Sequence, residues 1–196
     1  TDINTQGGLV TFNVSGDIGV SGGNGQLEVQ DSAFTGVVGA ANATWDFKAV
    51  AASTSISLSD IDFDGATGFT LSVLANGGDI FVTGNILDSN TGTADSATVT
   101  LQTTQVGGNI TTSGDDQIHS YGGDITYDSA GSIALPQTFS FAGAINLTAV
   151  GNISDAYAGP GGYDLSSAGG VITINAQAHV GGPNTGDALE VFDSIM

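Results

Sequence analysis

Cysteine and arginine are absent from this 196-residue sequence, and Lys48 is its only lysine. The absence of cysteine excludes a disulfide framework and thiolate metal sites. The scarcity of basic side chains against 20 acidic ones gives a formal net charge of −19. Such a charge repels the phosphates of nucleic acids and the headgroups of anionic lipids, so we expect neither as a partner.

Long hydrophobic runs are also missing. No apolar stretch approaches the roughly 18 residues that a membrane-spanning helix needs, so membrane insertion is not expected. The chain starts at Thr1 without a charged and then apolar leader, and we expect a mature chain or a segment of a larger protein. Proline occurs 3 times and glycine 31 times, which fits many tight turns between strands.

A short pattern recurs along the chain. It reads glycine, then apolar or small residues at every second position, then glycine and another aliphatic residue. Copies without gaps lie at 123–133, 143–153 and 161–171, and a fourth lies at 8–18. A period of two places the apolar residues on one face of an extended strand. The spacing near 20 residues within the central triplet is typical of coils in a stacked array.

We therefore predict an all-β fold, a right-handed parallel β-helix (β-solenoid) that forms a single domain over residues 1–196. An antiparallel β-sandwich is the alternative, because it uses the same alternation and turn-rich composition. Residues 31–53 are the least repetitive and are predicted to be an elaboration of one coil or a cap. Short helices at 41–52 and 187–196 are local alternatives to strands.

Three stretches resemble the repeats of filamentous-haemagglutinin-like exoproteins: GGDITYDSAGSI, GAINLTAVGNI and GGYDLSSAGGVI. Those proteins are large secreted bacterial adhesins built as parallel β-helices. The resemblance implies an extracellular or cell-surface stalk or adhesive surface, without catalytic residues. The uncapped ends of a stacked coil favour self-association or contact with neighbouring repeats, and a carbohydrate or another cell-surface component is the other partner that we consider.

Asp60, Asp62 and Asp64 alternate along the chain and are followed by Gly65. This spacing presents three carboxylates on one side, as a calcium-binding loop does. The glutamate that closes a helix-loop-helix site at the twelfth position is replaced by Leu71. The competing interpretation is a strand whose aspartates face water, so a calcium-dependent binding module stays open as an alternative function.

Asp115 and Asp116, with His119 three residues further on, resemble the paired aspartates of β-helical polygalacturonases. Two carboxylates can act as acid and base when their environments separate their pKa values. An acidic polysaccharide, however, needs cationic groups to hold it, and the chain has no arginine and only the distant Lys48. An acidic loop tip is therefore the preferred explanation of the pair. We expect a non-enzymatic structural or adhesive solenoid, with a carbohydrate-active β-helix enzyme as the alternative.

Overall fold

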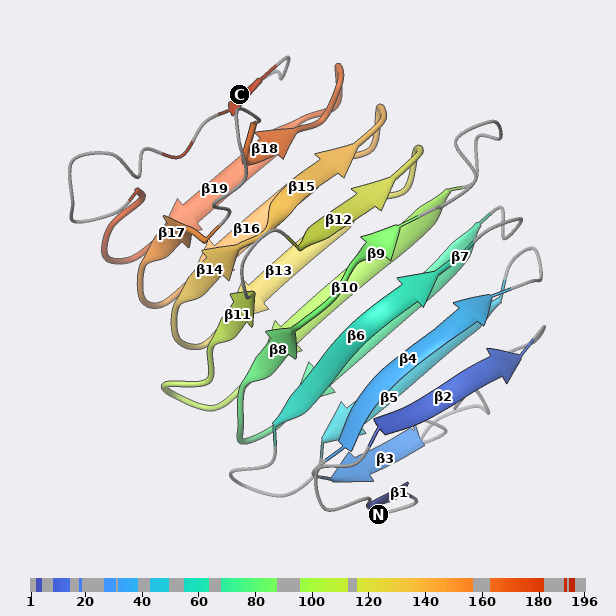
Figure 1. Ribbon diagram of the computed structural model, residues 1–196. Coiled ribbons are helices and arrows are strands. Elements are labelled where there is room, and N and C mark those ends of the chain that lie inside the picture. The colour runs from blue at the N-terminus through green and yellow to red at the C-terminus, as the bar shows by residue number, and fades with distance from the viewer. Residues whose placement is uncertain are drawn as a thin grey trace.

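A computed structural model of the chain shows strands stacked side by side along one axis (Figure 1). It describes residues 3–4, 9–14, 18, 27–30, 32–38, 43–49, 55–63, 68–87, 96–112, 116–156, 163–181, 189 and 191–192. Within these ranges the regular elements are all β-strands, and there is no helix. In the described ranges, no helix is long and apolar enough to cross a membrane.

The strands form two sheets. The first, here called sheet A, has eight strands. In spatial order they are β1 (Ile3–Asn4), β3 (Leu27–Gln30), β5 (Thr44–Ala49), β7 (Phe69–Ala75), β10 (Ala97–Thr103), β13 (Ile125–Ser129), β16 (Ile145–Ala149) and β19 (Ile172–Ala176).

Sheet B has twelve strands. Its main path runs through β17 (Ile153–Asp155), β14 (Ile133–Leu135), β11 (Ile110–Thr112), β8 (Ile80–Val82), β6 (Ile56–Asp62), β9 (Ile86–Leu87), β12 (Gln117–Ser120), β15 (Gln137–Ser140), β18 (Leu165–Ser166) and β20 (Val191–Phe192). Off this path, β4 (Ser32–Val38) pairs with β6 and with β2 (Leu9–Val14).

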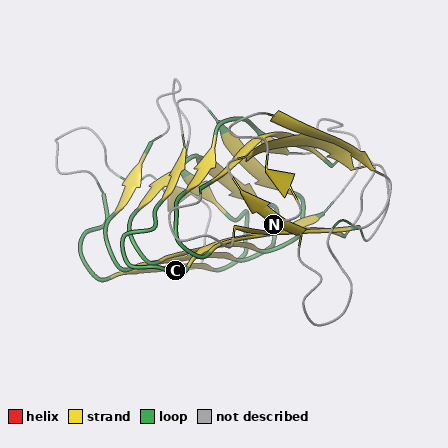
Figure 2. Cartoon of the chain, turned by 90° about the horizontal axis from the view of Figure 1, so that it is seen from below, coloured by secondary structure: helices red, strands yellow, loops and turns green. Residues whose placement is uncertain are grey.

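All pairings between the described strands are parallel, and partners come from successive passes of the chain. Viewed from below, the passes lie over one another as flattened loops with strands along both long sides (Figure 2). Parallel partners need a crossover connection, which each coil supplies by passing through the opposite sheet. The predicted parallel β-solenoid is confirmed, and the alternative of an antiparallel sandwich is wrong.

Sheet B divides at β6. The first half of β6 pairs with β8 through Ile56 and Leu58, and its end pairs with β9 through Ile61. In the pairing of β6 with β4, the register shifts between Phe34 and Gly36, and this shift separates the two halves of β6. Beyond β6 each coil therefore places two short strands in sheet B, one in the β8–β11–β14–β17 row and one in the row that contains β12 and β15.

The interior is filled by columns of equivalent side chains. Ile56, Ile80, Ile110, Ile133 and Ile153 are successive register partners, and all five are fully buried. Towards the N-terminal end aromatic rings take over the interior, with centroids of neighbouring rings 4.8 to 6.4 Å apart. Parallel stacking thus buries each coil beneath the next and gives one continuous core.

The register corrects the alignment of the repeat copies. The copies at 123–133 and 143–153 stack as aligned, because Ile125 pairs with Ile145 and Ile133 with Ile153. The copy at 161–171 does not, because its Leu165 lies in sheet B opposite Thr138. The copy at 8–18 is also shifted, since its strand β2 belongs to sheet B rather than to sheet A.

One corner explains why glycine recurs. A Cβ atom on Gly123, Gly143 or Gly170 would overlap a carbonyl oxygen of the preceding coil, that of Ala97, Gly123 and Gly143 respectively. The residue before each of these glycines has a positive φ: 120° at Gly122, 70° at Ala142 and 102° at Gly169. Residue 170, not 161, is thus the true equivalent of residue 143.

A second corner is closed by polar side chains. The backbone N–H of Asp79 donates to Ser55 Oγ (3.2 Å), that of Asn109 to Asp79 Oδ1 (2.7 Å), that of Ser132 to Asn109 Oδ1 (2.8 Å) and that of Asn152 to Ser132 Oγ (3.1 Å). We call this series the corner ladder. It satisfies backbone donors at the turn immediately before each isoleucine of the interior column, where strand pairing cannot.

The segment 31–53, predicted to be an elaboration or a cap, contributes β4 and β5, and each is paired on both sides. Its described residues are thus part of the two sheets. The helix alternative at 41–52 is wrong, because Thr44–Ala49 is a strand with Trp45 and Phe47 on its buried face. In the tail, Val191–Phe192 is a strand paired with β18, not part of a helix.

Candidate functional site

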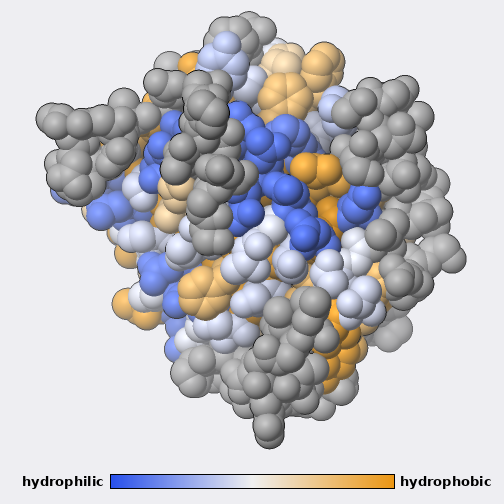
Figure 3. Space-filling model, viewed as in Figure 1, coloured by the Kyte–Doolittle hydropathy of each residue, from blue (hydrophilic) through white to orange (hydrophobic). Residues whose placement is uncertain are grey.

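Aromatic side chains gather on the outer face of sheet B, at the ends of β12 and β15 and just before β18. The group comprises His119, Tyr121, Phe139, Phe141 and Tyr163, and we call it the aromatic surface. The ring centroids of His119 and Phe139 lie 5.5 Å apart, those of Phe139 and Phe141 6.0 Å, and those of Tyr121 and Phe141 6.3 Å. In the space-filling view, apolar side chains lie at the end of β15 next to hydrophilic ones (Figure 3).

The strand alternation places these rings outside. In β15, Thr138 and Ser140 are buried while Gln137 and Phe139 are partly exposed. Thr138 is held inward because its Oγ1 bonds to Tyr127 Oη (2.8 Å) and to the Pro136 carbonyl (3.2 Å). Phe139 therefore must point to solvent, and Phe141, one pleat further, is 54% exposed. Contiguous exposed apolar side chains often mark a site that binds another molecule.

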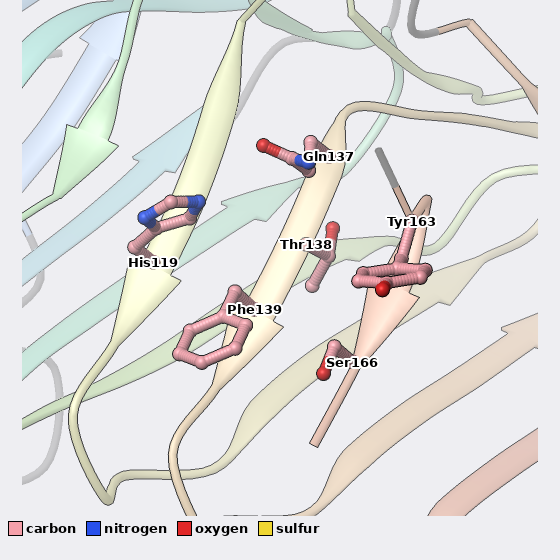
Figure 4. A pocket seen from close by; sticks show the side chains of 6 residues that line it. All are labelled: His119, Gln137, Thr138, Phe139, Tyr163 and Ser166. Atoms are coloured by element: carbon pink, nitrogen blue, oxygen red, sulfur yellow. The ribbon is translucent and has the colours of Figure 1, made fainter. Parts of the chain in front are cut away.

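A pocket opens beside Phe139. Register partners run from His119 on β12 to Phe139 on β15 and then to Ser166 on β18. The small Ser166 interrupts the row of rings, and Tyr163 stands at the side of the gap (Figure 4). The resulting pocket has a volume of about 90 Å³ and is lined by His119, Gln137, Thr138, Phe139, Tyr163 and Ser166.

The described residues that line the pocket carry no formal charge at pH 7. Burial lowers the pKa of His119, and the adjacent Gln137 side chain raises it by less, so the imidazole is uncharged at pH 7. No well-directed hydrogen bond from a described residue reaches its Nε2 atom, which is buried. Among the described residues, the pocket lining contains neither a carboxylate nor a lysine. These lining residues thus offer aromatic faces and an amide group.

Comparison with known proteins gives no relative. Neither a family model, nor a curated protein, nor a solved structure matches the chain. What stands on the structure alone is a β-solenoid repeat protein with parallel coils.

The residues of the predicted calcium motif are only partly brought together. Asp60 lies at the irregularity where β6 divides, is exposed, and its Oδ1 accepts the backbone N–H of Asn85 (3.0 Å). Asp62 ends β6 next to buried Ile61 and Phe63, and Asp64 lies outside the described residues. In the part of the chain that the structure describes, no three acidic or histidine side chains form a metal-binding group. Calcium binding stays a prediction.

The predicted catalytic pair is likewise incomplete. Asp115 lies outside the described residues, and Asp116 precedes β12. His119, which the sequence places near this pair, projects from β12 into the pocket with Gln137 and Phe139 (Figure 4). Asp116 is not among the described residues that line the pocket, and we therefore assign this histidine to the aromatic surface.

Sequence reasoning missed the aromatic surface, although its signal is visible. His119 and Phe139 are 20 residues apart, as are Tyr121 and Phe141, and Ile125 and Ile145 have the same spacing. Residues at the repeat spacing stack on adjacent coils, so outward aromatic residues at that spacing predict a row of rings on the surface.

Proposed function

We propose that the chain is a non-catalytic, extracellular adhesive segment of a larger surface or filament-forming protein, of the kind that filamentous-haemagglutinin-like exoproteins exemplify. The observation that carries the proposal is the aromatic surface, a contiguous group of outward rings on a strongly acidic molecule. The solenoid acts as a scaffold that holds these rings at fixed spacing.

The rigidity of the scaffold supports this function. His119 and Phe139 are carried by β12 and β15, whose neighbouring residues Ser120 and Ser140 are fully buried, and Tyr121 and Phe141 directly follow these strands. Rings held by packed strands lose little freedom when a ligand binds, which favours affinity. None of the described lining residues is a carboxylate or a lysine, which favours binding over acid–base chemistry, because that chemistry needs a titratable pair in reach of the substrate.

The proposal is tested by the adhesion of beads coated with the full chain to a cell layer under flow. Beads coated with a globular protein of similar negative charge are the control. The chain is expected to hold more beads than the control at every flow rate. Equal retention of the two coatings overturns the adhesive function.

A second assay addresses the enzymatic alternative. Incubation of the chain with neutral and acidic polysaccharides is expected to release no reducing ends. Turnover that disappears in an Asp116→Asn variant would instead identify a carbohydrate-active enzyme.

A further inference from the structure

We infer that the aromatic surface binds uncharged glycans, with the face of a pyranose ring against Phe139 and Tyr163. The inference rests on the proposed function, since it names the ligand class of the adhesive surface.

The rings provide the apolar part of the site. Phe139 lies between His119 and Phe141, at 5.5 and 6.0 Å, and borders the pocket on one side while Tyr163, 43% exposed, borders it on another. One face of a pyranose carries C–H groups whose hydrogens are slightly positive, and the face of an aromatic ring is negative. A sugar ring can therefore lie flat on such a side chain.

The size of the gap fits one edge of a sugar. The pocket of about 90 Å³ is several times the roughly 30 Å³ that a water molecule occupies. It is far below the roughly 300–1,000 Å³ of sites that enclose a whole small molecule or cofactor. A ligand must therefore place one edge in the pocket and extend over the neighbouring rings, as a glycan chain does.

The His119 ring lies next to the proposed site. Its centroid is 5.5 Å from that of Phe139, and its side chain is one of those that line the pocket. A glycan seated on Phe139 therefore changes the surroundings of the His119 ring.

Charge excludes acidic ligands. The formal net charge of −19 repels anionic glycans, and the described lining of the pocket includes no lysine that could hold one. A protein partner is disfavoured by area, since a stable protein interface takes about 800 Å² from each side and the aromatic surface comprises five side chains.

The test is calorimetric titration of the full chain with cellohexaose, xylohexaose, mannohexaose and N-acetylchitohexaose, with a galacturonic acid hexamer as the acidic probe. At least one neutral hexasaccharide is expected to bind, and the acidic one is not. Phe139→Ala and Tyr163→Ala should each weaken binding tenfold or more, while Phe139→Tyr keeps the ring and should bind within about threefold of the native chain. Thr126→Ala, on the outer face of sheet A, is the matched control and should leave binding unchanged.

Binding of none of the four neutral probes overturns the inference, as does binding that survives both alanine variants. Circular dichroism establishes that each variant is folded, and the exposed Tyr163 keeps the test valid if Phe139→Ala does not fold. The bead assay separates the two proposals. Beads that adhere equally with native and Phe139→Ala chains retain the adhesive function and remove the glycan site, whereas beads that do not adhere remove the adhesive function itself.

Discussion

Replacing Asn109 by alanine should destabilise the solenoid by about 2–3 kcal/mol. Asn109 is the centre of the corner ladder. Its Oδ1 accepts the Ser132 N–H at 2.8 Å, and its Nδ2 donates to Asp79 Oδ1 at 3.2 Å and to the Gly107 carbonyl at 3.0 Å. All three bonds disappear in the variant, whereas the bond from the Asn109 backbone N–H to Asp79 remains.

The magnitude follows from these three bonds. A neutral hydrogen bond contributes about 1 kcal/mol net and one to a charged group about 1.5–3 kcal/mol. The simple sum is about 4 kcal/mol, but the corner is only partly buried, and water can replace some of the lost partners. The expected loss is therefore nearer 2–3 kcal/mol than the full sum.

Urea unfolding followed by fluorescence measures this loss. Trp45 is the only tryptophan and is fully buried, so its emission reports unfolding without a label. Asn146→Ala is the matched control, because Asn146 is an outward residue of β16 whose side chain makes no hydrogen bond within the described residues. Its substitution should stay within about 0.5 kcal/mol. A change for Asn109→Ala as small as that of the control would refute the assignment of stability to the corner ladder.

Three further predictions concern other parts of the solenoid. Ala142→Gly should stabilise the fold by about 0.5–1 kcal/mol, because it relieves a positive φ of 70°. Gly143→Ala should destabilise the fold by about 1–3 kcal/mol, because the added Cβ overlaps the preceding coil. Thermal unfolding of both variants checks these two values. Burial raises the pKa of Tyr127, so its contribution to stability is complete below pH ~10 and declines at higher pH; urea unfolding against pH should show a steeper alkaline decline for the native chain than for Tyr127→Phe. Spin labels on cysteines at positions 72 and 173, the ends of a register column that spans four strand spacings, should give a distance of about 19 Å between backbones in a pulsed dipolar measurement, and about 30 Å or more would contradict the stacking.

The architecture could be predicted because it depends on short sequence patterns that recur along the chain. Alternation identifies strands, and recurrence near 20 residues identifies stacked coils, as the pairing of Ile125 with Ile145 confirms. Trp45 and Phe47, two residues apart, share a buried strand face as their spacing indicates. The helix considered at 41–52 fails because burial of these two rings against the neighbouring coils outweighs local helix propensity.

The alternation of apolar residues could not predict which of the two sheets each strand belongs to. A strand in sheet A and a strand in sheet B have the same period of two, so the copy at 161–171 aligned well while its Leu165 lies in sheet B. The assignment is fixed at the corner where Gly143 and Gly170 contact carbonyl oxygens of the preceding coil. That contact joins residues about one coil apart in sequence and is visible only in three dimensions.

The candidate site was hidden for a related reason. Outward positions carry no pattern that folding requires, and His119 was considered only with the acidic residues next to it in sequence. Its partners in space are Gln137 and Phe139 on the next coil. The small side chain of Ser166 leaves the pocket open. This residue lies in sheet B opposite Phe139, and the sequence did not show which sheet its strand belongs to.

Histidine side-chain NMR tests the glycan-binding surface most directly. The chain has two histidines: His119 in the pocket, and His179, which is exposed and away from the pocket lining. On titration of ¹⁵N-histidine-labelled chain with the neutral hexasaccharide that binds best, the His119 Nε2 resonance should shift to saturation while the signals of His179 stay in place. A His119 resonance that does not move while the hexasaccharide binds, or equal shifts at both histidines, would contradict the account.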